Sequence, residues 1–169
     1  SYLEARAKSA GLTATVARLR AEVFGGDPVF PPMLSNYPQF RENQIVLFTK
    51  RKAAIDEEVT ALQTLLGLAQ RELEMTEPLL KTGDVSRTEV LRLERQVAEI
   101  GSQITNKRNR YFQDAQTELS KALEDLAAVE QTMAQRITQV DQTELRAPLH
   151  GVVKNVRITT RGGVIRPGE

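Results

Sequence analysis

The clearest feature of the sequence is an apolar stripe that recurs at alternating steps of four and three residues within residues 40–82. Such heptad spacing places the apolar side chains on one side of a helix, where they pack against a second helix. The pattern therefore predicts a long helix over residues 40–82. Pro78 should kink its last turn, because proline removes one helical hydrogen bond. The stripe consists of Ile55, Val59, Leu62, Leu66, Ala69, Leu73, Thr76 and Leu80.

A longer stripe predicts another helix over residues 87–142, which contain no proline. At 1.5 Å per residue, this helix is roughly 80–85 Å long. Its spacing is heptad-like near residue 87 and then approaches a period of about 3.6, which predicts a left-handed supercoil that straightens farther on. A helix of this length needs its apolar stripe to pack on the preceding helices. The stripe consists of Leu93, Val97, Ile100, Ile104, Tyr111, Ala115, Leu119, Ala122, Leu126, Val129, Met133, Ile137 and Val140.

The first part of the chain predicts a third helix over residues 1–24, with apolar residues at helical spacing and no proline. Two glycines at positions 25 and 26 end it, since glycine readily takes the left-handed conformation of a helix C-cap. The next stretch, residues 27–38, predicts an irregular loop, because proline fixes φ and lacks an N–H. The apolar residues of the helix are Leu12, Val16, Leu19 and Val23, and the prolines of the loop are Pro28, Pro31, Pro32 and Pro38.

Residues 83–86 predict a tight reversal between the two long helices. Gly83 can end the first of them in a left-handed conformation. Ser86 and Glu89 have the spacing of a capping box, in which each side chain accepts a bond from the other residue's backbone N–H, and Val85 and Val90 flank it as a hydrophobic staple. The prediction is a mainly α fold: a long antiparallel helical or coiled-coil hairpin of three helices, its first arm broken by the proline-rich loop, with residues 83–86 as its tip.

The pattern changes after residue 143, where short stretches typical of β-strands alternate with turns. We predict strand, turn and strand over residues 145–156, then a turn and strand over residues 159–165. So few strands are only marginally stable in water, and we expect their partner strands to come from a segment before Ser1. The predicted domains are a helical hairpin over residues 1–143 and half of a split β domain over residues 144–169.

The composition favours elongated helices and not an enzyme. Aromatic residues make up 5% of the chain and there is no tryptophan, so a thick globular core would lack its usual bulky fillers. The formal net charge is only +1, and the basic clusters are short, so we expect no nucleic-acid partner. The chain has no cysteine, and its single histidine, His150, lies in a predicted turn. We therefore expect no catalytic residue, no cofactor and no metal site.

The C-terminal stretch carries the most specific family signal. Its segments Leu145-Arg-Ala-Pro-Leu-His-Gly-Val-Val and Thr160-Arg-Gly-Gly-Val-Ile-Arg-Pro-Gly-Glu resemble the second lipoyl-like half-motif of HlyD-type membrane fusion proteins, the periplasmic adaptors of type I secretion systems. The segment Ala17-Arg-Leu-Arg-Ala-Glu, ahead of a loop rich in glycine and proline, is similar to their first helix. The resemblance spans essentially the whole chain. It implies that residues 144–169 are lipoyl-like and that the helical hairpin interrupts this domain.

The resemblance also implies a function. Such adaptors link an inner-membrane ABC transporter to an outer-membrane TolC-like channel for protein secretion. The implied location is the periplasm of a Gram-negative bacterium, in a protein anchored in the inner membrane, and the implied self-association is a hexamer. The transporter would contact regions mostly outside this chain.

The hairpin tip is the implied channel-docking site. Adaptors of related export systems carry a tip pattern Arg-x3-Leu-x6-Ser. Leu79 and Ser86 have the Leu-x6-Ser spacing, but Met75 occupies the arginine position, and Arg71, one turn earlier, is the candidate substitute. The implied docking set is Arg71, Met75, Leu79, Gly83, Asp84, Val85, Ser86 and Arg87.

Two other interpretations compete with a secretion adaptor. The chain could be an adaptor of another tripartite efflux system, or a coiled-coil scaffold with no part in transport. The β segment favours an adaptor over a scaffold, because a scaffold has no reason to insert its hairpin in a split lipoyl-like domain. A carrier domain is disfavoured, since biotinyl and lipoyl carriers typically present a lysine within Met-Lys-Met and this tripeptide does not occur.

Overall fold

The computed structural model describes residues 2–141, 149–152 and 154 of the chain. This part contains three α-helices and one short 3-10 helix: α1 (Tyr2–Phe24), η1 (Pro32–Asn36), α2 (Pro38–Thr82) and α3 (Arg87–Asp141). These bounds confirm the mainly α prediction, the three helices and the position of the tip. The predicted β segment over residues 144–169 lies outside the described residues, apart from five that are in neither helix nor strand, and stays a prediction.

Two prolines of the predicted loop are the first residues of helices. Pro32 starts η1, and Pro38 starts α2. Proline fits this position because the N–H that it lacks has no partner in the first turn of a helix. The prediction of an irregular loop over residues 27–38 is therefore wrong for η1 and for Pro38. Pro78, in contrast, lies inside α2, which continues to Thr82, and the expected kink there stays a prediction.

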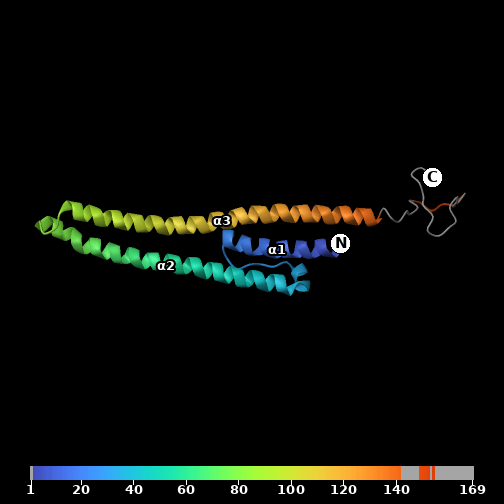
Figure 1. Cartoon of the computed structure of the whole chain (residues 1–169), viewed down its shortest axis with the longest axis horizontal. Helices are drawn as coiled ribbons and strands as arrows, with labels where there is room; N and C mark the ends of the chain where they lie inside the picture. Colours follow the sequence, from blue (N-terminus) through green and yellow to red (C-terminus); the bar gives the residue numbers. More distant parts are fainter. Residues whose placement is uncertain (1, 142–148, 153, 155–169) are drawn as a thin grey trace.

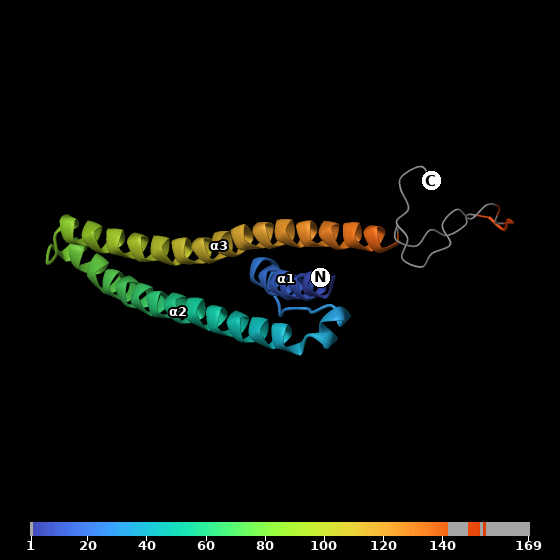
Figure 2. The same cartoon turned by 45° about the vertical axis from the view of Figure 1, so that its right-hand side comes forward.

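The helices α2 and α3 are the two arms of an antiparallel hairpin, and α1 lies between them at the end away from the reversal (Figure 1). Figure 2 shows the same arrangement from a second direction. The helices α1 and α2 both run toward the reversal, so the two helices of the broken first arm overlap side by side. The hairpin thus has a three-helix base, where α1 is present, and a two-helix distal part that ends at the tip.

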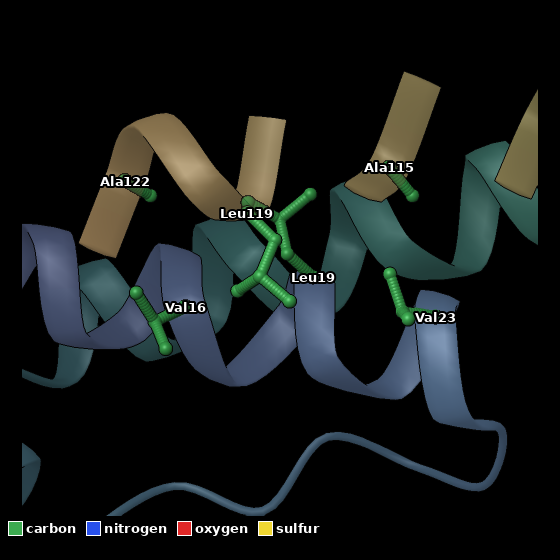
Figure 3. Close-up of a cluster of buried hydrophobic side chains, with 6 residues drawn as sticks. All are labelled: Val16, Leu19, Val23, Ala115, Leu119 and Ala122. Atoms are coloured by element: carbon green, nitrogen blue, oxygen red, sulfur yellow. The ribbon is translucent and has the colours of Figure 1, made fainter. Parts of the chain in front are cut away.

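The base has two small hydrophobic cores on α1. One joins α1 to α3 and includes Leu19, which is fully buried (Figure 3). Complete burial of such a side chain contributes about 1.5–3 kcal/mol. The first core consists of Val16, Leu19, Val23, Ala115, Leu119 and Ala122, with Leu126 packed against it. The second joins α1 to η1 and the start of α2 and consists of Ala10, Ala14 and Leu34, with Phe30, Tyr37 and Phe40 packed against it.

The predicted stripes of α2 and α3 form the seam of the distal part. On α2, Val59 and Ala69 are buried and the other stripe residues are half-buried, which confirms that stripe. On α3, Leu93 and Ile104 are buried. The prediction for Ile137 is wrong, because its side chain is 47% exposed. The end of α3 extends past the N-terminal end of α1 (Figure 1), so little of α1 remains to cover the last turns of α3. The side chain of Val140 lies outside the described residues.

Candidate docking site at the hairpin tip

The reversal begins at Gly83, which follows the last residue of α2. Its φ of 80° and ψ of 6° are left-handed. The Gly83 amide donates to the carbonyl of Leu80 at 3.3 Å, and the Asp84 amide donates to the carbonyl of Leu79 at 3.0 Å. These two bonds form a Schellman motif, which satisfies carbonyls that the end of a helix otherwise leaves unpaired. The predicted end of the helix at Gly83 is confirmed.

The helix α3 begins at a cap made by Ser86. The backbone amide of Glu89 donates to Ser86 Oγ at 3.2 Å, which confirms one half of the predicted capping box. The other half is wrong, because the Glu89 carboxylate accepts bonds of 2.7 and 3.1 Å from Arg92 instead of one from the Ser86 amide. A guanidinium makes two charge-assisted bonds to a carboxylate, and these are stronger than one bond from a neutral N–H. Val90 is buried and Val85 half-buried, as the predicted staple requires.

Ion pairs and hydrogen bonds organise the charges near the tip. The hydrogen bond from Arg92 lowers the pKa of the Glu89 carboxyl, and the same bond raises the pKa of Arg92. The negative charge of Glu72 on α2 raises the pKa of Arg92 further, by a smaller amount. On the other side of the reversal, the Thr82 hydroxyl lies 2.5 Å from Asp84 Oδ2. The tip therefore presents charges of both signs, and the side chains of Glu89, Arg92 and Asp84 are in local contacts.

The structure places the expected docking residues in two groups. Arg71, Met75 and Leu79 follow one another by one turn each along one exposed face of α2, with Met75 70% and Leu79 41% exposed. Only Leu79 adjoins the reversal, since at 1.5 Å per residue Arg71 lies roughly 18 Å before Gly83. The second group surrounds the reversal itself; Gly83, Asp84, Ser86 and Arg87 are exposed and Val85 is half-buried.

Sequence reasoning missed two exposed leucines that extend the first group. Leu65 and Leu68 are 52% and 53% exposed, and with Met75 and Leu79 they form an apolar strip along α2. Each member directly precedes a seam residue in the sequence, so the strip runs along the flank of the seam. The helical spacing of these four apolar residues is the sequence pattern from which the strip could have been predicted. An exposed apolar strip at helical spacing is typical of a surface that contacts another protein.

The geometry of the reversal suits contact with another protein. A Cβ built on Gly83 has no atom within 4 Å, so a partner can approach the backbone closely. Neither a metal-binding cluster nor a membrane-spanning helix is found in the described part of the chain. Among these residues, no group of three or more His, Cys, Asp or Glu side chains could hold a metal ion. Over the same residues, we find no helix with the length and apolar character that crossing a membrane requires.

This long three-helix hairpin is the fold of the soluble domain of a membrane fusion protein. The chain is similar to the crystal structure of the soluble domain of LipC, a membrane fusion protein of a type I secretion system, with a TM-score of 0.53. The sequence identity is 20%, and the match covers 89% of this chain and 93% of that one. No protein-family profile and no curated protein matches the sequence. At this identity the likeness shows the fold.

Proposed function

We propose that this chain is the periplasmic hairpin of an HlyD-type adaptor, a membrane fusion protein of a type I secretion system. The observation that supports the proposal is the likeness of the whole hairpin to the soluble domain of LipC. The shape suits a bridging role, because α3, with 55 residues, extends roughly 80 Å from base to tip. In this proposal the chain has a mechanical, non-enzymatic role and needs no cofactor.

The tip would contact an outer-membrane TolC-like channel. Leu79 and Ser86 retain the spacing expected of a docking tip, and both are exposed there. Met75 replaces the expected arginine, and Arg71 would reach the channel only if the channel extended about three helical turns along α2. The apolar strip beside Met75 offers such a partner a contact surface along the same length of helix.

The rest of the assembly follows from the same proposal. The protein would be anchored in the inner membrane of a Gram-negative bacterium and would contact an ABC transporter through regions mostly outside this chain. Hexamers would form around the substrate path, and residues 144–169 would complete a lipoyl-like domain. An adaptor of another tripartite efflux system would also be anchored in the inner membrane. It would differ from a type I secretion adaptor in the channel and the transporter that it contacts.

A crosslinking experiment tests the docking at the tip. The chain has no cysteine, so Ser86→Cys in the full-length protein gives one reactive handle at the tip. Ser120→Cys is the matched control, since Ser120 is also an exposed serine of α3 but lies about 50 Å nearer the base. During active export, Ser86→Cys should capture the channel and Ser120→Cys should not. If cysteines at the base capture the transporter while Ser86→Cys captures no channel, tip docking is refuted. If neither the transporter nor the channel is captured, the scaffold interpretation is favoured.

A further inference from the structure

The apolar face of α1 repeats itself after seven residues. Residues 10–16 read Ala-Gly-Leu-Thr-Ala-Thr-Val, and residues 17–23 read Ala-Arg-Leu-Arg-Ala-Glu-Val. Alanine, leucine, alanine and valine return at the same places, and all eight are buried or half-buried. Apolar contact is non-directional, so such a face packs in similar fashion after it slides by one repeat. That slide is about 10 Å along the helix.

Two slides of α1 would preserve valine contacts with α3. In the structure, Val23 lies beside Ala115, and Val16 lies beside Ala122 (Figure 3). A slide of seven residues toward the tip would bring Val16 beside Ala115. A slide of seven residues toward the base would bring Val23 beside Ala122. Each slide keeps one of the two valine–alanine contacts, with one valine in place of the other, so the retained contact does not distinguish the slid register from the native one.

The two repeats differ in charge. Arg18 and Glu22 of the second repeat occupy the places of Gly11 and Thr15 in the first. Both charged residues are buried, with Arg18 only 4% and Glu22 only 7% exposed. Their side chains pair at 2.7 Å. Buried charges require partners, so this pair is tolerated only where the other helices supply them.

Both other helices supply partners to the buried pair. Arg18 Nε donates to Gln44 Oε1 of α2 at 2.7 Å, and Arg18 Nη2 lies 3.6 Å from Glu118 of α3. Arg51 of α2 lies 3.3 Å from Glu22 and 3.3 Å from Glu118. The contact between Arg51 and Glu22 is an ion pair without hydrogen-bond geometry. After either slide, Arg18 and Glu22 would move about 10 Å and leave these partners.

We propose that this charged cluster is a register lock, which excludes the seven-residue slides that the apolar face of α1 permits. Burial of ions costs desolvation that offsets much of their attraction, so the cluster contributes little net stability. Its effect is on the choice between registers, because a slid helix would keep the buried pair of Arg18 and Glu22 but lose its partners on α2 and α3. Buried polar groups fix register in coiled coils in the same way. The proposal is independent of the proposed function. The cluster consists of Arg18, Glu22, Gln44, Arg51 and Glu118.

Replacement of the buried pair by apolar residues tests the lock. Arg18→Met with Glu22→Leu removes both buried charges and leaves Arg51 and Glu118 paired with each other. Because the chain has no cysteine, introduced cysteine pairs report the register directly. The pair Val23→Cys and Ala115→Cys reports the native register. The pairs Val16→Cys with Ala115→Cys, and Val23→Cys with Ala122→Cys, report the two slides.

The slid pairs should form disulfides at least about tenfold more often when the charges are removed, as expected for loss of charge-assisted bonds. The matched control is Lys107→Met with Glu58→Leu, which removes an exposed pair between α2 and α3 (2.9 Å) and should not increase the slid disulfides. A second variant, Arg18→Gln with Glu22→Gln, also removes both charges but keeps polar side chains. Circular dichroism measures the helical content of the apolar variant and of this second variant.

Three results would overturn the proposal. If both variants form only the native disulfide, at the unmodified rate, the loop and the apolar cores set the register. If none of the three disulfides forms while helical content is retained, the cluster docks α1 and does not select among registers. If both variants lose their helices, the cluster is required for stability, which contradicts a role in specificity alone.

Discussion

The left-handed backbone conformation of Gly83 predicts that replacement of this glycine destabilises the tip. Gly83→Ala places a methyl group where φ is 80°, and no atom lies within 4 Å of the new Cβ. The substitution therefore creates no clash, and its cost is purely conformational. Any loss of stability measures how much the reversal depends on a residue that tolerates positive φ.

The size of this loss follows from two opposing effects. An alanine held in the left-handed region costs roughly 1–2 kcal/mol. Replacing glycine also reduces the entropy of the unfolded chain, which stabilises the folded state by about 0.4–1 kcal/mol. We expect Gly83→Ala to lower the free energy of unfolding by about 1 kcal/mol, the balance of these two effects. For a chain of this size, that loss lowers Tm by about 2–4 °C.

Two glycines inside helices are matched controls. Gly67 in α2 and Gly101 in α3 also have no atom within 4 Å of a built Cβ, but neither has positive φ. Gly67→Ala and Gly101→Ala should each stabilise the protein by about 0.5–1 kcal/mol, because alanine is the better helix former. Urea denaturation followed by circular dichroism compares the three variants. If Gly83→Ala shifted the midpoint in the same direction as the controls, the left-handed backbone would not be the reason for glycine at the tip.

Three further predictions concern the distal part. Pro78→Ala restores a helical N–H at an exposed position and should raise the free energy of unfolding by up to ~3 kcal/mol in urea denaturation; an unchanged midpoint would contradict this. Leu93→Ala truncates a side chain that is 1% exposed and should lower that free energy by about 2–5 kcal/mol. Arg92→Gln should raise the pKa of Glu89 toward its ordinary value in an NMR titration. Because the folded-state pKa is lowered, the stabilisation from this pair is present above the ordinary pKa and is lost as pH falls through the lowered value.

The distal part could be predicted from the sequence because its information is local. A heptad stripe states which face of a helix is buried, and the structure buries or half-buries every predicted stripe residue of α2. The helix end at Gly83 and the cap at Ser86 depend on backbone bonds between neighbours in sequence. The capping box failed only for Glu89, whose carboxylate had a stronger donor in Arg92 one turn onward.

The base was harder to predict because its contacts join residues far apart in the chain. Arg18 and Gln44 are separated by 26 positions, and no local spacing relates them. A stripe on α1 indicates that the helix is buried, but it does not indicate that two other helices cover it. The apolar strip on α2 was hard to predict for a different reason, since Leu65 and Leu68 directly precede seam residues and are part of the same run of apolar positions.

The position of one helix along its neighbour is fixed differently at the two connections, between α2 and α3 and between α1 and α2. The helices α2 and α3 are joined by residues 83–86, and the Schellman motif and the Ser86 cap leave that short connection almost no freedom to slide. In contrast, α1 is joined to α2 by residues 25–37, a connection long enough to follow a shift of several residues. Leu34 of this connection packs on Ala10 and Ala14, but the apolar face of α1 repeats, so these apolar contacts provide no strict constraint on its register. Charged residues buried among three helices supply that constraint, which explains why Arg18 and Glu22 occupy an interface that otherwise repeats alanine, leucine and valine.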